Sequence, residues 1–150
     1  MNQSLAPIQD ALRALSRLSP QAQYDALIES ERTTALVRAL APQDLHAIAQ
    51  AVGKEEALEL LPHCDGNQLV GLTDLSGWRG FAFDLVGFED WLTAMFESGH
   101  QTVANYLKCA DIEQVLLYLN SRVQVHACDE EGDFPTLSNE VPGDATWTSP

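Results

Sequence analysis

Hydrophobic residues recur along most of this chain with the period of amphipathic α-helices. In the first such segment, apolar positions spaced three or four residues apart share one helical face: Leu5, Ile8, Leu12, Leu15 and Leu18. Similar spacing returns in segment after segment as far as residue 122. The pattern predicts that residues 5 to 121 are predominantly helical, with seven or more helices and no sheet.

Several of these helices have recognisable starts and ends. Ser19 followed by Pro20 is typical of an N-cap and first helical residue, and Pro42 opens another helix in the same way. Gly53 and Gly99 follow apolar-periodic segments, where glycine commonly ends a helix, and Asp111 is placed to cap the last one. These signals divide the chain into short helices.

The segment "FEDWLTAMFESG" has the strongest helical pattern. Its apolar residues Trp91, Leu92 and Met95 lie close together on one face, so we expect them in the core. The segment "DIEQVLLYLNSRV" repeats the pattern, and we expect Leu116 and Leu119 to be core residues as well.

The predicted helix starts recur at nearly fixed intervals. They lie at residues 20, 42 and 66, and near 88 and 111, which gives intervals of 22, 24, about 22 and about 23 residues. Such a period favours an all-α helical array, an α-solenoid-like superhelix of short helices. An irregular helical bundle with similar helix lengths is the alternative.

The pattern changes after residue 122. "RVQVHAC" alternates apolar and polar residues, which predicts a short C-terminal strand, and residues 123–150 contain six acids and no Lys or Arg. We therefore predict a helical-repeat domain over 1–122 and a strand plus irregular acidic tail over 123–150, poorly ordered from about residue 128. A single strand needs a partner, so this region is a candidate truncation point of a longer chain.

Composition narrows the classes of function. The chain has 22 acids against 8 Lys and Arg, a net charge of −14, which disfavours nucleic-acid binding because phosphates would be repelled. No apolar run approaches the roughly 20 residues of a membrane span, which argues against membrane insertion. Three sparse cysteines and a polar beginning without a signal-peptide pattern predict a reduced, cytoplasmic protein.

The stretch "DLSGWRGFAFD", residues 74–84, has two interpretations. As a joint between helices, Trp78 would fill the gap and Arg79 would pair with Asp74 or Asp84. As an interaction surface, Trp78, Arg79 and Phe81 would be exposed, since aromatic and arginine side chains dominate binding hot spots. We favour the joint, because a large aromatic residue between turn glycines more often packs than waits for a ligand.

Motifs for catalysis and metal binding are absent from the sequence. Cys64 with its neighbours His63 and Asp65, and His126 with Cys128, offer ligand types but not the spacing of a zinc site. The acidic run 129–133 lacks the alternation of a calcium loop. Neither a phosphate-binding glycine loop nor a nucleophile motif occurs, so we assign no catalytic residue, metal or cofactor.

One longer stretch resembles a known family. "RALAPQDLHAIAQAVGKEEALELLPHCDGNQLVGLTDLSGWRG", followed by "FEDWLTAMFESG", is similar to the N-terminal region of an uncharacterised bacterial family of large helical cytoplasmic proteins, a domain of unknown function. The helix-start rhythm is also similar, more weakly, to the cytosolic helical domain of bacterial magnesium transporters. The resemblance implies a right-handed helical array, a longer full-length protein and no assigned activity.

These observations favour a helical-repeat module for protein interaction or scaffolding over an enzyme. Solenoids offer long grooves rather than deep catalytic pockets. Its partner would be another protein or the remainder of its own longer chain. The alternative is the N-terminal fragment of a larger enzyme whose chemistry lies in sequence outside this chain. A divalent-cation sensor is a third, weaker interpretation that rests on the transporter similarity alone.

Overall fold

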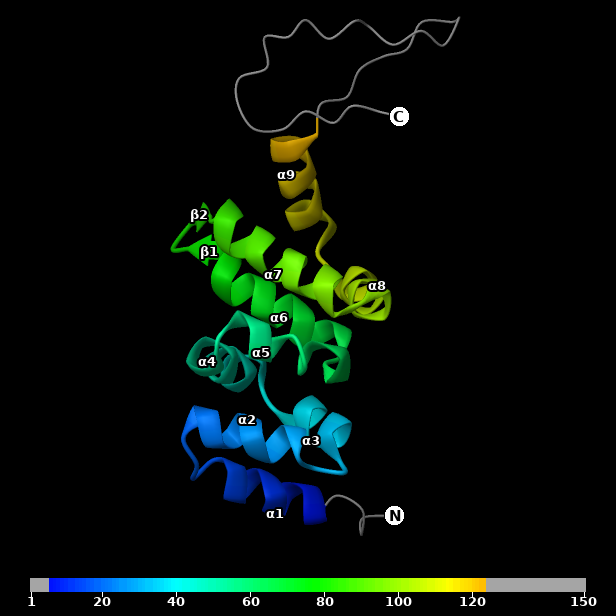
Figure 1. Ribbon diagram of the computed structural model, residues 1–150. Helices are drawn as coiled ribbons and strands as arrows, with labels where there is room; N and C mark the ends of the chain where they lie inside the picture. The colour runs from blue at the N-terminus through cyan, green and yellow to red at the C-terminus, as the bar shows by residue number, and fades with distance from the viewer. Residues whose placement is uncertain (1–5, 124–150) are drawn as a thin grey trace, which may run out of the picture. The chain divides into compact units, whose positions relative to one another are not determined.

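The computed structural model describes residues 6–123, and these are helical apart from one small hairpin (Figure 1). The prediction of an all-α helical array is confirmed. The elements are α1 (Ala6–Leu15), α2 (Pro20–Ile28), α3 (Thr33–Ala39), α4 (Pro42–Val52), α5 (Lys54–Ala57), the 3-10 helix η1 (Leu61–His63), α6 (Gly66–Gly77), β1 (Trp78–Arg79), β2 (Ala82–Phe83), α7 (Leu85–Ser98), α8 (His100–Cys109) and α9 (Ile112–Arg122).

The predicted helix boundaries are confirmed by their capping geometry. The Ser19 side chain accepts a hydrogen bond from the Ala22 amide at the start of α2, and the Asp111 side chain accepts one from Glu113 at the start of α9. Gly53 and Gly99 end α4 and α7 with positive φ angles of 98° and 129°, a backbone region that favours glycine.

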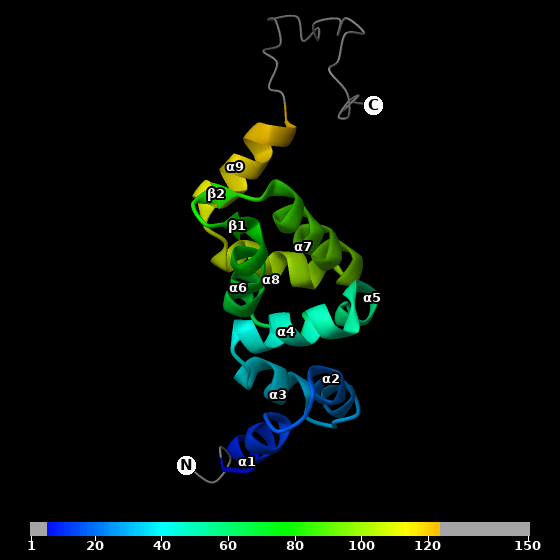
Figure 2. The same ribbon diagram turned by 90° about the vertical axis from the view of Figure 1, so that its left-hand side faces the viewer.

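The chain divides into two compact units between Ala110 and Asp111. Within the first unit, α2 packs on α3 and α4, α4 packs on α6, and α6 packs on both α7 and α8. Figure 1 and the turned view in Figure 2 show these helices of the first unit following one another as successive layers, from α1 to α8. Each layer can therefore cover an apolar face of the next.

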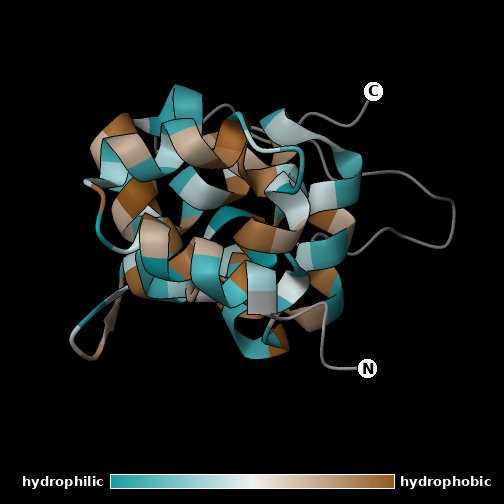
Figure 3. Cartoon of the chain, turned by 90° about the horizontal axis from the view of Figure 1, so that it is seen from below, coloured by the Kyte–Doolittle hydropathy of each residue, from teal (hydrophilic) through white to brown (hydrophobic). Residues whose placement is uncertain are grey.

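The core of the first unit lies where α6, α7 and α8 meet. Its largest fully buried side chains include Leu69, Leu72, Phe88, Met95 and Tyr106, each exposing at most 1% of its surface. Figure 3 shows hydrophobic and hydrophilic residues interspersed along the helices, as amphipathic helices require.

Two of the three residues that were expected in the core on α7 are buried. Trp91 and Met95 are buried, so their prediction is confirmed, whereas Leu92 is half-buried. The expectation for α9 is wrong, because Leu116 and Leu119 are exposed. In the described part of the second unit α9 is the single helix, and one helix cannot bury its own apolar face.

A buried glutamine joins α3 to α6. Asp65 and Gln68 form a capping box at the start of α6, in which each side chain bonds the other's backbone amide. The Gln68 side-chain amide also donates to the carbonyl oxygens of Val37 and Leu40, at 2.7 and 2.8 Å. One side chain thus satisfies backbone groups at the start of one helix and at the end of another.

The prediction of no sheet between residues 5 and 121 is wrong. β1 and β2 form an antiparallel hairpin in which Trp78 is opposite Phe83 and Arg79 is opposite Ala82. Gly80 begins the two-residue turn with φ of 64°, as the common hairpin turns require. Strands of two residues are too short to show alternation in the sequence.

The strand expected from Val123 onward lies beyond the described residues except for Val123 itself, and the tail from about 128 to 150 lies wholly outside them, so both stay predictions. The domain boundary between 122 and 123 also stays a prediction.

Candidate functional site

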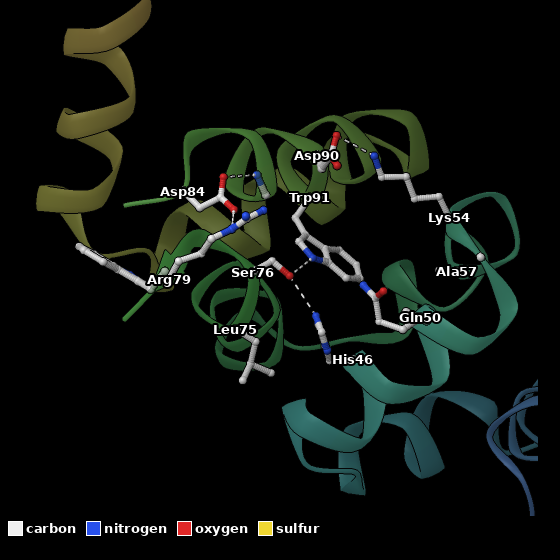
Figure 4. A pocket seen from close by; sticks show the side chains of 14 residues that line it. His46, Gln50, Lys54, Ala57, Leu75, Ser76, Arg79, Asp84, Asp90 and Trp91 are labelled. Atoms are coloured by element: carbon white, nitrogen blue, oxygen red, sulfur yellow. Dashed lines mark hydrogen bonds and ion pairs between the residues drawn. The ribbon is translucent and has the colours of Figure 1, made fainter. Parts of the chain in front are cut away.

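The first unit contains an open cleft of about 750 Å³. It is lined by α4, α5, the C-terminal end of α6, β1 and the N-terminal half of α7 (Figure 4). Ligand sites in proteins usually have volumes of roughly 300–1,000 Å³, with apolar walls and a few polar groups. The size of this cleft therefore suits a small molecule or a short peptide segment.

Three side chains from three helices meet at the floor of the cleft. Trp91 Nε1 of α7 donates a hydrogen bond to Ser76 Oγ of α6 at 2.9 Å, and the same oxygen lies 2.9 Å from His46 Nε2 of α4 (Figure 4). The His46 and Trp91 rings are tilted by 40°, with centroids 6.1 Å apart. A single hydroxyl therefore links α4, α6 and α7.

Burial favours a neutral His46 in this trio, and the tautomer of the neutral ring then sets the direction of the hydrogen bond with Ser76. Desolvation lowers the pKa of His46, which favours the neutral ring near pH 7. When Nε2 is the unprotonated nitrogen, the Ser76 hydroxyl donates to it and accepts from the Trp91 indole. The hydrogen bonds of Ser76 to His46 and to Trp91 are then both satisfied at the floor of the cleft.

Two ion pairs lie on the rim of the cleft. Lys54 Nζ is 2.8 Å from Asp90 Oδ1, and the Arg79 guanidinium donates through Nε to Asp84 Oδ2. Asp84 is also the N-cap of α7 and accepts from the Gly87 amide at 3.2 Å. The Gly87 hydrogen bond, aided by Arg79, holds the pKa of Asp84 below its usual value, so this carboxylate is ionised near neutral pH.

Gly87 lets α7 approach α6 closely at this site. A Cβ atom at position 87 would collide with the carbonyl oxygen of Ser76. The missing side chain brings the start of α7 against the end of α6, where Ser76 reaches the Trp91 indole. Close helix packing at a glycine thus shapes the cleft.

The hairpin beside the cleft is anchored by aromatic contacts. Trp78 meets Phe83 edge-on at a centroid distance of 5.3 Å, and Phe83 lies 5.2 Å from the buried Phe88. Trp78 itself is 42% exposed and lines the cleft, so the prediction that it fills the gap between helices is wrong. The half-buried Phe83 takes the inner position, because it faces α7 from the second strand.

The structure confirms the joint and one of its predicted ion pairs. Residues 78–83 connect α6 to α7, and Arg79 pairs with Asp84, one of the two partners predicted for it. Of the candidate interaction surface, Arg79 lines the cleft with Trp78, and Phe81 is fully exposed at the turn. Their role in binding stays a prediction.

Sequence reasoning missed His46 and Ser76 at the floor of the cleft and the Lys54–Asp90 pair on its rim. His46 and Ser76 are 30 positions apart, and Lys54 and Asp90 are 36 apart, so no local spacing connects either pair. The local sequence did contain a signal for Asp84 as the N-cap of α7, since an aspartate before an apolar-periodic segment is a common helix start.

Within residues 6–123, the ligand types noted in the sequence are not brought together as a metal site. Over residues 6–123 no group of three or more His, Cys, Asp or Glu side chains could hold a metal ion. His63 Nδ1 lies 2.7 Å from Thr34 Oγ1, and burial raises the pKa of Cys64 to about 12, so its thiol stays protonated. His126 and Cys128 lie outside the described residues.

The described residues therefore form an all-α domain with a hairpin and an amphipathic cleft, and none of their helices is long and apolar enough to cross a membrane. The chain belongs to a family of unknown function (DUF6178), whose model matches residues 2–145. No curated protein and no solved structure matches it. The expected membership of an uncharacterised family is thus confirmed.

Proposed function

We propose that the first unit is a protein-interaction module whose contact site is the cleft together with the hairpin tip. The observation that carries the proposal is Phe81, a fully exposed phenylalanine at the turn of a hairpin whose first strand lines the cleft. Leaving an aromatic ring in water forgoes a burial worth about 1.5–3 kcal/mol. A hairpin that is anchored on Phe88 yet presents such a ring is suited to insert it into a partner.

A photo-crosslinking residue at position 81 tests this proposal in the cell that makes the protein. We expect p-benzoylphenylalanine at position 81 to form a discrete adduct. The same residue at position 96, an exposed phenylalanine outside the cleft lining, is the control. Replacing Gln50, an exposed residue of the lining, with tryptophan should fill the cleft and remove the adduct. Equal adducts from 81 and 96, or an adduct that survives Gln50→Trp, would contradict the proposal.

The enzyme interpretation has one observation in its favour, the contact between Ser76 Oγ and a neutral His46. Two features weigh against a nucleophile there. Ser76 Oγ already accepts the Trp91 indole N–H, and it lies at the C-terminal end of α6, where the helix dipole disfavours negative charge. The interaction module is therefore the better-supported function. Repeat architecture, a longer full-length protein and the similarity to magnesium transporters stay predictions.

A further inference from the structure

The elements that form the cleft carry an unusual distribution of charge. Residues 42–98, from α4 to α7, contain ten acids and only two basic residues, Lys54 and Arg79. Both basic residues line the cleft, and each is paired with an aspartate of the same lining. The cleft is therefore balanced in charge, while the eight other acids of these elements give its surroundings a negative potential. Such a field attracts basic segments and repels acidic ones.

Of the two rim aspartates, Asp90 is accessible to a second cation. The side chains of Lys54 and Asp90 are 61% and 53% exposed, so an incoming ammonium can share Asp90 while Lys54 stays in water. The Asp84 side chain is only 13% exposed, so a second cation reaches it only when Arg79 moves aside. The backbone amide of Gly87 also bonds Asp84, so the carboxylate does not depend on Arg79 for its position. Arg79 is 82% exposed and can turn away from Asp84 without losing hydration.

The walls between the ion pairs are apolar. Leu75 and Trp78 are both 42% exposed and line the cleft, together with the small side chains of Ala49 and Ala57. These surfaces can receive an apolar side chain, and the Trp78 ring can also contact a lysine or arginine next to it.

We propose that the cleft binds an extended segment of a partner protein in which basic residues flank an apolar side chain. The apolar side chain lies against Leu75 and Trp78, and the basic groups meet Asp84 and Asp90 at the rim. This inference rests on the proposed function, because it names the chemistry of the segment that the interaction module binds.

Three capped peptides test it on the whole chain: acetyl-Lys-Leu-Phe-Leu-Lys-amide, its Glu counterpart and its Ser counterpart. By titration calorimetry we expect the Lys peptide to bind at least about fivefold more tightly than the Ser peptide, from an exposed ion pair with Asp90 and a second with the less exposed Asp84. The Glu peptide should bind most weakly. The advantage of the Lys peptide should shrink in 0.5 M NaCl, at roughly a 4 Å screening length. The NMR signal of the Trp91 indole N–H, whose residue lines the cleft, should move on binding.

Two matched variants distinguish an effect of the rim carboxylates on binding from an effect of the net charge of the chain. Asp90→Asn removes one rim charge and should weaken the Lys peptide by about threefold, the value of one exposed pair. Glu97→Gln makes the same change in net charge on an exposed part of α7 outside the lining, and should leave binding unchanged. Equal weakening by the two variants would overturn the inference, because the attraction would then be general.

The remaining outcomes distinguish this inference from the proposed function. Tight binding of the Ser or Glu peptide in the cleft would contradict the inference that the bound segment is basic. It would not contradict the proposed protein-interaction function. Failure of all three peptides, or binding that leaves the Trp91 signal unmoved, would also overturn the inference. Crosslinking from position 81 then decides the proposed function by itself.

Discussion

The buried face of α7 has two adjoining parts, an interior side and a cleft side, which hold neighbouring helices by different means. On the interior side, Phe88 and Met95 are fully buried among apolar neighbours. On the cleft side, Trp91 is 8% exposed and joins Ser76 and His46 through hydrogen bonds. Apolar burial is strong and non-directional, whereas a hydrogen bond fixes geometry for a small net free energy. We infer that the interior provides stability and that the cleft side provides a shaped, partly polar surface.

The largest effect is expected on the interior side. Phe88→Ala should lower the free energy of unfolding by about 3–5 kcal/mol, since it leaves a cavity where a fully buried ring was. Urea denaturation measures this change. Phe96→Ala, at an exposed position of the same helix, should change it by less than about 0.5 kcal/mol. Similar costs for the two variants would mean that α7 packs through another face.

A smaller effect is expected at the cleft floor. Ser76→Ala removes the hydrogen-bond partner of both the Trp91 indole and His46, and should cost about 1–3 kcal/mol in free energy of unfolding. In a Trp91→Phe background, which lacks the indole N–H, the same substitution should cost less. Additive costs in this double-mutant cycle would show that the hydrogen bond contributes no stability.

The cleft side should also respond to pH in a way that the interior does not. Burial lowers the pKa of His46 in the folded state below its unfolded value of about 6.5. Its contribution is therefore fully present above pH 6.5 and is lost as the pH falls through the lower folded pKa. Denaturation at pH 8 and pH 5 should show a larger loss for the wild type than for His46→Gln. The same loss in both would assign the pH dependence to other groups.

The smallest effect on stability is expected at the hairpin tip. Phe81→Ala should leave the free energy of unfolding within about 0.5 kcal/mol of the wild type, because the ring is fully exposed. The same variant should weaken any complex that depends on the hairpin, which crosslinking from position 50 would report. A large loss of stability would instead mean that Phe81 packs within the domain.

Much of the helical framework was predictable because its signals are local. Capping by Ser19 and Asp111, the proline starts and the glycine ends all act within about one helical turn. The faces of α4 and α7 follow from the same short period. For α8 the local pattern is less sufficient: Tyr106 and Leu107 are adjacent apolar residues, yet Tyr106 is buried and Leu107 is exposed. The choice between neighbouring apolar residues depends on which helix lies opposite.

The sequence by itself determined where the helices begin and end and that α7 buries Trp91 and Met95, since these depend on contacts between residues a few positions apart. The cleft was decided by tertiary structure alone. His46 meets Ser76, and Lys54 meets Asp90, because α4, α5, α6 and α7 pack together, with α7 held close to α6 at Gly87. The hairpin that places Phe81 in solvent depends likewise on the anchoring of Phe83 against Phe88. Such pairs carry no spacing signal, since the packing of helices, and not the local chain, sets the distance between them.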